Sequence, residues 1–259
     1  MSAPAERTVL VNGERCRVWE KGSGAPIFYL AGLSGLPRWT PFLDRLAERH
    51  RVVAPSLPGF PGATGHDRLD NLLDWVAATL DLLEGVGFEG GDLIGASVGG
   101  TLAAEVAAMA PRLVRRLVLI APFGLYDKGS PPIDLWGQKP GALPGVISAK
   151  PDAFAAFTAP PEGIAPAEWS ILMNRANEAA ARLLWPLGDT RLERRLHRIR
   201  CPTLILWGAA DQVLAPSYAQ RFAAGIAGKT RIVVLPGAGH LADLDAPDAA
   251  ADAALNAPG

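Results

Sequence analysis

The stretch DLIGASVGGTLAAE, residues Asp92–Glu105, runs from an apolar segment through a corner of small residues into a helix-like segment. Its centre, Gly95 to Gly99, fits the pattern G-x-S-x-G, and no other serine of the chain has glycine two positions away on both sides. This spacing is typical of a strained strand-to-helix turn, because the glycines let strand and helix approach while the serine hydroxyl stays clear of the sheet. Unpaired amides at a helix start also favour developing negative charge. The stretch therefore predicts a nucleophilic Ser97.

Similar apolar runs recur on both sides of this stretch, and helical patterns separate them. The strand-like runs are APIFYLAG (25–32), RVVAPSL (51–57), GDLIGAS (91–97), RRLVLIAP (115–122), PTLILWG (202–208) and TRIVVLPG (230–237). Runs this continuous are typical of strands buried on both faces. Amphipathic helical patterns lie at 39–50, 69–87, 98–111 and 217–228. Because strand and helix alternate, we expect an α/β fold with a mainly parallel sheet flanked by helices.

Two segments depart from this alternation. TVLVNGERCRVWE (8–20) has alternating apolar residues around Asn12-Gly13, which predicts a tight hairpin and two antiparallel edge strands. Residues 124–197 lose the strand pattern, are rich in Pro and Gly as far as Pro166, and then become helical to Trp185. A structureless loop of this length is uncommon in a compact domain, so we interpret it as an inserted cap. The expected units are a core of residues 1–123 and 198–259 and a cap of residues 124–197.

Composition narrows the possible partners and the setting. The chain has 259 residues, 25 basic and 26 acidic, and these charges are scattered along the sequence. This distribution gives no basic footprint for nucleic acid or for an anionic membrane surface. No leader pattern or membrane-spanning run is present, so we expect a cytoplasmic monomer or homodimer acting on a small molecule. Cys16 and Cys201 lack metal-ligand spacing and are expected to be buried free thiols.

A serine nucleophile needs a base, and a base needs an orienting group. The chain has four histidines, of which only His240 follows a buried strand directly, in the loop VVLPGAGH. Of the others, His50 lies at the end of a helical pattern, His66 in a Gly-rich loop and His197 on a charged surface segment. A loop histidine on the surface is the plain alternative for His240. Its position after the last strand nevertheless predicts that it reaches Ser97 at the sheet edge.

Asp211 is the candidate for the orienting acid, since LILWGAADQVLAP places it in the loop after another buried strand. A turn-forming aspartate is the alternative. The order Ser97, Asp211, His240 is the one expected when a G-x-S-x-G turn comes first. Asp127, Asp243 and Asp245 are weaker candidates, because the first follows a different strand and the others are too close in sequence to His240.

An acyl-transfer site also needs backbone donors for a tetrahedral oxyanion. The amide of Val98, directly after the serine, is one candidate. The second is the amide of Leu33 in YLAGLSGLP, where Gly32 lets the backbone turn after an earlier strand. Ser34 in the same loop is a further candidate for substrate contact, although a turn-stabilising serine is the simpler interpretation.

Together the hairpin, LAGLSG, PSLPGFPG, LIGASVGG, LILWGAADQV and GAGH resemble the α/β-hydrolase superfamily over nearly the whole chain. The resemblance implies an eight-stranded, mostly parallel sheet with a helical cap inserted after the sixth strand. It also implies a Ser97–His240–Asp211 triad and an oxyanion hole at Leu33 and Val98, with no cofactor or metal. The chain departs from the usual superfamily pattern at two places that concern the support of loops. It has Ala31-Gly32 where members often carry His-Gly, and Ser56 where they often carry Asp.

Within this superfamily, Ser97 disfavours the haloalkane dehalogenases and epoxide hydrolases, which use a carboxylate nucleophile. A serine carboxylesterase-like activity on a small, largely apolar ester fits the residues best. Carbon–carbon bond hydrolases of ring-cleavage products are the main alternative, and a ligand receptor with little turnover is another. Peroxidase-type and acyl-transfer enzymes of the superfamily keep the serine triad and are further alternatives. The candidate substrate-binding residues are Ser34, Trp136, Trp169, Met173, Arg175, Trp185 and Leu241; Arg175 would bind substrate in a carbon–carbon hydrolase, and Leu241 stands where those enzymes usually have Trp.

Overall fold

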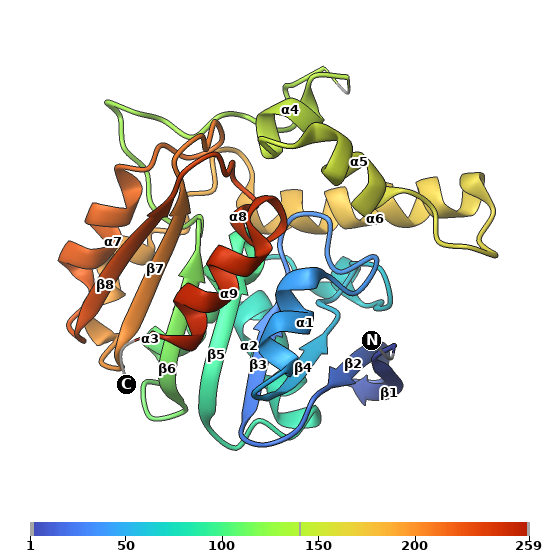
Figure 1. Ribbon diagram of the computed structural model, residues 1–259, viewed down its shortest axis with the longest axis horizontal. Helices are drawn as coiled ribbons and strands as arrows, with labels where there is room; N and C mark the ends of the chain where they lie inside the picture. Colours follow the sequence, from blue (N-terminus) through green and yellow to red (C-terminus); the bar gives the residue numbers. More distant parts are fainter. Residues whose placement is uncertain (1–2, 140, 258–259) are drawn as a thin grey trace.

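The computed structural model describes residues 3–139 and 141–257, in which the strands form one eight-stranded sheet with the order β1-β2-β4-β3-β5-β6-β7-β8 (Figure 1). The expected core limits at residues 1 and 259 lie outside the described residues. The strands are β1 (Ala5–Val11), β2 (Glu14–Lys21), β3 (Pro26–Leu30), β4 (Arg51–Pro55), β5 (Gly91–Ala96), β6 (Val114–Ile120), β7 (Thr203–Gly208) and β8 (Thr230–Leu235). Each apolar run of the sequence therefore corresponds to a strand.

The strand directions confirm a mostly parallel sheet with an antiparallel hairpin at one edge. β1 pairs with β2, and β2 with β4, in antiparallel register, whereas the pairs from β4 to β8 are parallel. Asn12 and Gly13 both have positive φ, 52° and 81°, as a two-residue hairpin turn requires. Because the central strands are parallel, the loops that follow them meet at one edge of the sheet.

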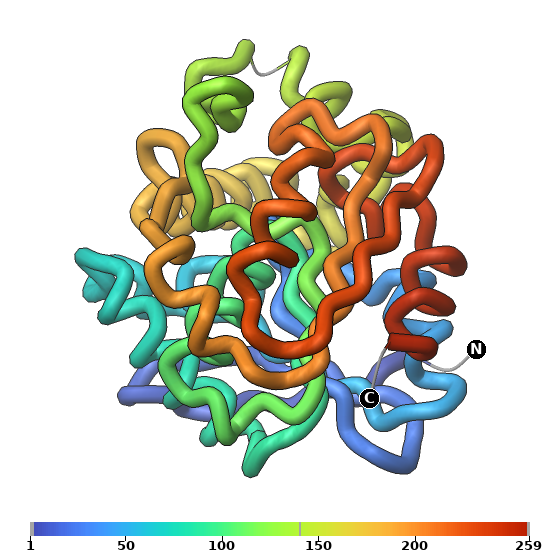
Figure 2. The backbone as a smooth tube through the Cα atoms, turned by 90° about the vertical axis from the view of Figure 1, so that its left-hand side faces the viewer, coloured from blue at the N-terminus to red at the C-terminus, as the bar shows by residue number. Residues whose placement is uncertain are grey.

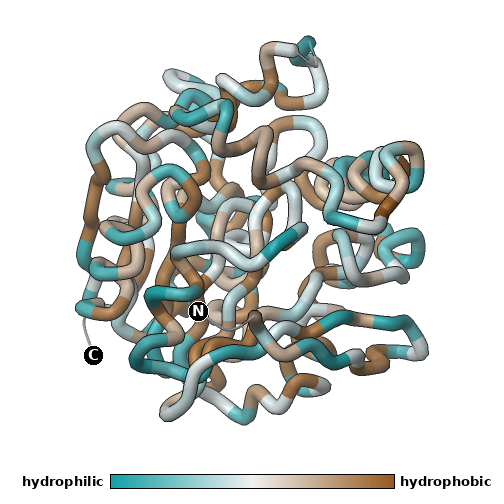
Figure 3. Tube along the Cα trace, turned by 45° about the vertical axis from the view of Figure 1, so that its right-hand side comes forward, coloured by the Kyte–Doolittle hydropathy of each residue, from teal (hydrophilic) through white to brown (hydrophobic). Residues whose placement is uncertain are grey.

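Helices cover both faces of the sheet and divide the core in two. α1 (Pro41–Ala47), α8 (Ala242–Asp245) and α9 (Pro247–Leu255) lie on one face, and α2 (Leu72–Gly85), α3 (Ser97–Met109) and α7 (Tyr218–Gly225) on the other. In β3, Ile27 and Tyr29 pack into the first core, while Phe28 and Leu30 pack into the second. Figure 3 shows hydrophobic residues along the central strands and hydrophilic residues on the outer loops. Alternate residues of a strand face opposite sides, which is why the central runs are apolar throughout.

β8 differs from the expectation that TRIVVLPG is buried on both faces. Of its residues only Leu235 is buried, and Val234 is 42% exposed. The reason is position, because β8 is the last strand in the sheet order and pairs only with β7. An apolar run therefore indicates a strand without indicating whether that strand is central.

The segment between β6 and β7 carries a further group of helices, the expected insertion after the sixth strand. It contains α4 (Leu143–Ile147), α5 (Pro151–Thr158), α6 (Pro166–Leu184) and the 3₁₀ turns η2 (Leu192–Arg194) and η3 (Leu196–Arg198); a further turn, η1 (His66–Arg68), follows β4. Figures 1 and 2 show α4, α5 and α6 at one end of the sheet. The α6 pattern matches its prediction, whereas α4 and α5 lie in the Pro/Gly-rich part where no helix is predicted. η3 packs against α3.

No helix within residues 3–139 or 141–257 has both the length and the hydrophobicity that crossing a lipid bilayer requires.

Candidate active site

Ser97 stands at the junction of β5 and α3 in a strained conformation. Its φ is 51°, in the left-handed region that residues with a side chain rarely adopt and that costs about 1–3 kcal/mol. A Cβ atom at Gly95 would lie 2.3 Å from the carbonyl oxygen of Gly99, and one at Gly99 would lie 2.2 Å from that of Leu30. Both glycines of G-x-S-x-G are thus required for the close approach of strand and helix.

Three residues predicted to act together meet at the carboxyl edge of the sheet. Ser97 Oγ lies 2.8 Å from His240 Nε2, and His240 Nδ1 lies 3.0 Å from Asp211 Oδ2. The side chains of His240 and Asp211 are fully buried, and Ser97 has no exposed surface. They come from loops after β5, β7 and β8, which parallel pairing brings to one edge. This arrangement can pass a proton from an alcohol to an imidazole.

The carboxylate of Asp211 is oriented by its own loop. Its Oδ1 accepts hydrogen bonds from the backbone N–H of Val213, at 2.8 Å, and of Leu214, at 3.0 Å. The other oxygen therefore faces the imidazole. Because an ionised carboxylate only accepts hydrogen bonds, it favours the His240 tautomer that donates from Nδ1. Nε2 is then the acceptor for the Ser97 hydroxyl.

The other histidines lie away from Ser97. His50 Nδ1 faces the carbonyl oxygen of Ala25 at 3.2 Å, and His197 is exposed on η3. His66 is buried in η1, where its Nε2 lies 3.5 Å from a carboxylate oxygen of Glu178 on α6.

Asp245 is a residue of the site whose role sequence reasoning missed. Its buried carboxylate accepts hydrogen bonds from Ser148 Oγ at 2.5 Å, from Ala149 N–H at 2.9 Å and from Gly239 N–H at 2.7 Å. The backbone N–H of His240 itself donates to the carbonyl oxygen of Ile147 at 3.0 Å. The loop bearing His240 is thus fastened to the segment between α4 and α5. No local signal reveals this, because two of the donors lie almost a hundred positions away in the sequence.

The remaining aspartates have partners of their own. Asp243 accepts a hydrogen bond from the Tyr29 hydroxyl at 2.6 Å, and burial raises the pKa of Asp243 although this hydrogen bond opposes the shift. Asp127 closes a turn by accepting from Gly129 N–H, and it faces Arg221 at 3.5 Å. Neither contacts His240 through a hydrogen bond in the part of the chain that the structure describes.

The loop expected to supply an oxyanion donor lies directly against Ser97. A Cβ atom on Gly32 would lie 3.2 Å from Ser97 Cβ, and Gly99 N–H donates to the carbonyl oxygen of Ala31 at 3.1 Å. Within residues 3–139 and 141–257, the backbone N–H groups of Leu33 and Val98 have no backbone partner outside regular helix and strand bonding. Among the described residues, both amides are thus free of such backbone bonds.

Arg17 on β2 supports this loop and the loop after β4. Its Nη2 donates to the carbonyl oxygens of Leu36 at 2.6 Å and Pro61 at 3.1 Å, and to Ser56 Oγ at 3.3 Å. Ser56 Oγ in turn donates to Pro61 at 2.8 Å. Ser56 thus supports the loop after β4.

A cavity of about 480 Å³ lies between this loop and the insert. Its lining includes four residues predicted for the oxyanion hole or for substrate contact, Leu33, Ser34, Trp136 and Met173. The other lining residues are Leu135, Gln138, Leu143, Ile147, Phe154, Thr158, Asn174, Asn177 and Ala180. None of the described residues that line it is charged.

Four predicted substrate-binding residues do not line this cavity. Trp169 is buried against α5 and donates from Nε1 to the carbonyl oxygen of Thr158 at 2.8 Å. Trp185 is 61% exposed and packs edge-on against Trp136, at 6.0 Å between ring centroids. Leu241 is buried beside Gly32.

Arg175 is the fourth. Its guanidinium donates to the carbonyl oxygens of Gly59 at 3.3 Å and Ala63 at 3.2 Å, and so fastens α6 to the loop after β4. A guanidinium placed in this way is used for packing the insert and does not line the cavity.

Cys16 and Cys201 are buried free thiols, as predicted. Cys16 donates to the carbonyl oxygen of Ser56 at 3.0 Å, and burial raises its pKa to about 12. Among the described residues, no group of three or more His, Cys, Asp or Glu side chains is arranged to hold a metal ion.

Known proteins resemble this chain in sequence and in fold. The acetyltransferase component of the acetoin cleaving system of Pseudomonas putida is 29% identical over 94% of this chain and 66% of its own length. The 2-hydroxymuconate semialdehyde hydrolase of Pseudomonas sp. (strain CF600) is 31% identical over 52% of this chain and 50% of its own length. Each alignment thus covers only part of the relative. A serine hydrolase from Cycloclasticus zankles has the same fold, with a TM-score of 0.74 at 19% identity, over 96% of both chains.

A family match extends over a larger part of this chain than the alignment with the hydrolase from strain CF600. Residues 9–253 fit the sequence profile of the Alpha/beta hydrolase family, from the hairpin to α9. That range includes the strand-to-helix turn at Ser97 and the loops of Asp211 and His240. The chain belongs to the alpha/beta hydrolase family.

Proposed function

We propose that this protein is a serine hydrolase that cleaves a small, neutral and largely apolar carboxylic ester through an acyl-enzyme intermediate. The observation that carries the proposal is the hydrogen-bonded series of Ser97, His240 and Asp211, with contacts of 2.8 and 3.0 Å in a buried setting. A serine hydroxyl is a weak nucleophile, and an imidazole at this distance is the group that activates it.

Each group has one role in the proposed reaction. Ser97 Oγ attacks the ester carbonyl carbon while His240 Nε2 takes the hydroxyl proton, and Asp211 stabilises the imidazolium that forms. The amides of Leu33 and Val98 donate to the oxyanion of the tetrahedral intermediate, and one such donor typically contributes about 10²–10³-fold to turnover. His240 then protonates the leaving alkoxide. Water attacks the acyl-enzyme by the same route and releases the acid.

The cavity supports a neutral substrate. Its volume of about 480 Å³ falls within the usual range of small-molecule sites, about 300–1,000 Å³. Most lining side chains are apolar, and the polar ones are uncharged. A charged group would be desolvated there without an opposite charge, which is strongly unfavourable.

Carbon–carbon bond hydrolysis is the second candidate, favoured by the similarity to 2-hydroxymuconate semialdehyde hydrolase. An anionic substrate of that kind needs a cation in the cavity, and Arg175 is engaged instead with two backbone carbonyls. Assays of p-nitrophenyl esters and ring-cleavage products side by side distinguish the two reactions. Turnover of the ring-cleavage products alone would replace the ester proposal.

The direct test is Ser97→Ala, assayed on p-nitrophenyl acetate and butyrate. Hydrolysis should fall to background with the fold retained, while Ser217→Ala, at an exposed serine before α7, should keep wild-type activity. Hydrolysis by Ser97→Ala at the wild-type rate would contradict the assignment. A fluorophosphonate probe adds a second readout, since an activated Ser97 is labelled even if turnover is slow. Labelling without steady-state hydrolysis would indicate a receptor of the same fold.

A further inference from the structure

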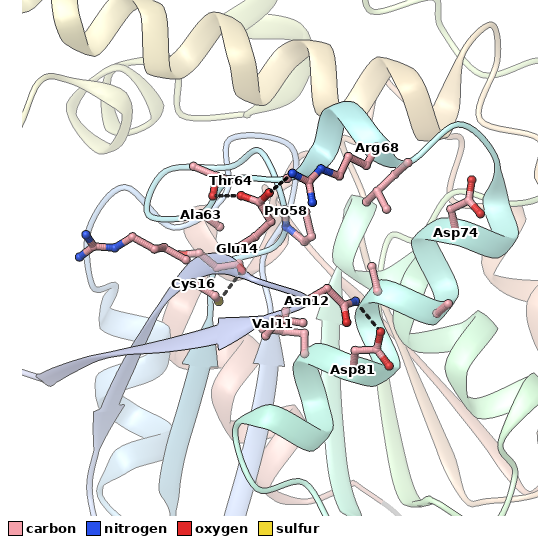
Figure 4. A pocket seen from close by; sticks show the side chains of 17 residues that line it. Val11, Asn12, Glu14, Cys16, Pro58, Ala63, Thr64, Arg68, Asp74 and Asp81 are labelled. Carbon is pink, nitrogen blue, oxygen red and sulfur yellow. Dashed lines mark hydrogen bonds and ion pairs between the residues drawn. The ribbon is translucent and has the colours of Figure 1, made fainter.

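A second cavity, of about 300 Å³, lies between the β1–β2 hairpin, η1 and α2 (Figure 4). Its polar groups are largely paired with one another. Glu14 binds Arg68 at 3.1 Å and accepts from Thr64 at 2.7 Å, and Asn12 donates to Asp81 at 2.7 Å. A ligand here would have to compete with these bonds. The cavity beneath the insert is different, because it contains polar groups without protein partners.

Those groups belong to α6. Met173, Asn174, Asn177 and Ala180 all line the 480 Å³ cavity. Asn177 follows Met173 by four positions and Asn174 by three, and Ala180 follows Asn177 by three, so the four residues share one side of the helix. Asn174 and Asn177 lie one turn apart, so their carboxamides are neighbours. The two side chains together offer two carbonyl acceptors and four N–H donors to the same volume.

Neither carboxamide has a hydrogen-bond partner among residues 3–139 and 141–257. Two other polar lining residues are already bonded: Gln138 Nε2 donates to the carbonyl oxygen of Asp134, and Thr158 Oγ1 to that of Phe154, both at 2.9 Å. Both asparagine side chains are exposed and can be hydrated. A purely apolar ligand that covered them would leave the amides unpaired, at a cost of up to about 1 kcal/mol for each group, which is below that of a fully buried one.

We propose that Asn174 and Asn177 determine specificity, selecting esters that carry a neutral hydrogen-bonding group, a hydroxyl or an amide, on the part of the substrate that faces α6. The inference deepens the proposed function of Ser97 and rests on it. A neutral group is required because no charged side chain among the described residues lines the cavity. The site should discriminate against an ester that lacks this group, because the asparagine amides would then be left unpaired. Sites built to hydrogen-bond a substrate group discriminate in this way against substrates without it.

The test compares kcat/KM within two substrate pairs that differ by one hydroxyl. The first pair, p-nitrophenyl hexanoate and p-nitrophenyl 6-hydroxyhexanoate, carries the hydroxyl on the acyl part. The second pair, pentyl acetate and 5-hydroxypentyl acetate, carries it on the alcohol part. The wild-type protein should prefer the hydroxylated ester in at least one pair, by about fivefold for one neutral hydrogen bond.

The variants Asn174→Leu and Asn177→Leu preserve side-chain size and should abolish that preference while retaining hydrolysis of the plain ester. Ser170→Leu is the matched control, because Ser170 is exposed on α6 one turn before Asn174 and does not line the cavity. Asn174→Ala and Asn177→Ala give the same comparison if a leucine variant does not fold.

An unchanged preference in all four asparagine variants, or a wild-type preference for the plain ester in both pairs, would overturn the inference and leave the proposed function intact. A wild-type protein that hydrolyses none of the four esters would overturn both. The preference ratio is a readout that a purely structural role of the asparagines would not alter, because both substrates of a pair meet the same folded protein.

Discussion

Replacing Asp245 tests whether the loop of His240 is held by its tie to the insert. In Asp245→Ala three buried or partly buried donors lose their acceptor: Ser148 Oγ–H, Ala149 N–H and Gly239 N–H. An unsatisfied buried group costs about 1–3 kcal/mol, so the variant should lose about 4 kcal/mol of unfolding free energy. Asp245→Asn should lose about 1 kcal/mol, because its amide oxygen still accepts from the two backbone donors.

Activity should follow the same order for a geometric reason. Gly239 is the residue before His240, and displacing the imidazole by about 1 Å can cost about 10²-fold in rate. We expect Asp245→Ala to lower kcat on p-nitrophenyl butyrate by tenfold or more with KM little changed, and Asp245→Asn to retain most of it. Ser148→Ala, which removes one of the three bonds, should fall between wild type and Asp245→Ala.

Urea unfolding gives the stability of each variant, and initial rates well below the melting temperature give kcat and KM. Two results would refute the reasoning. One is equal stability of the alanine and asparagine variants, which would mean that the three donors find other partners. The other is a large loss of stability with wild-type kcat, which would mean that His240 is positioned without this tie.

Three further predictions concern other parts of the molecule. Because burial raises the pKa of Cys16 from 9.0 to about 12, the unfolded chain loses the thiol proton at lower pH than the folded one, and the free energy of unfolding should fall as pH rises above 9. Between pH 7 and 10, urea titrations should show wild type losing about 1.4 kcal/mol more than Cys16→Ala. Parallel plots of stability against pH for the two proteins would contradict this. Ser97→Gly should be about 1 kcal/mol more stable than Ser97→Ala in the same assay, since glycine relieves the strain at φ 51°, and a less stable glycine variant would exclude strain at this turn. Arg195→Met should lower the free energy of unfolding by about 3 kcal/mol, because it removes the cation paired at 2.6 Å with the carboxylate of Glu105, which is 1% exposed. A thermal melt unchanged from wild type would show that this ion pair contributes nothing to stability.

The sequence predicts the strand-to-helix turn and the sheet because these depend on local patterns. The run of apolar residues before Ser97 and the glycines at 95 and 99 specify a buried strand and a close helix contact, whatever the rest of the chain does. Asn12-Gly13 similarly specifies a hairpin through two positive φ angles. Once parallel strands are expected, Asp211 and His240 follow as neighbours of Ser97, since loops after such strands share one edge.

The insert was harder to predict because its structure depends on contacts made elsewhere. α4 and α5 have five and eight residues, too short to be stable alone, and their helix starts lack a side-chain cap. Arg175 and Trp185 have residue types suited to a binding site, yet one is engaged with the loop after β4 and the other faces solvent. Helical spacing gives the face on which a residue lies, and packing decides what that face meets.

The sequence by itself therefore determined the strands of the sheet, the helices that alternate with them and the residues that carry the proposed chemistry, because burial periodicity and turn conformation are encoded within a few neighbouring residues. Only the tertiary structure decided that β8 is an edge strand, that Asp245 ties the loop of His240 to residues near position 148, and that α6 turns Asn174 and Asn177 toward the cavity. These features are pairings between distant parts of the chain, and their energies exist only once folding has brought the partners within hydrogen-bonding or packing distance.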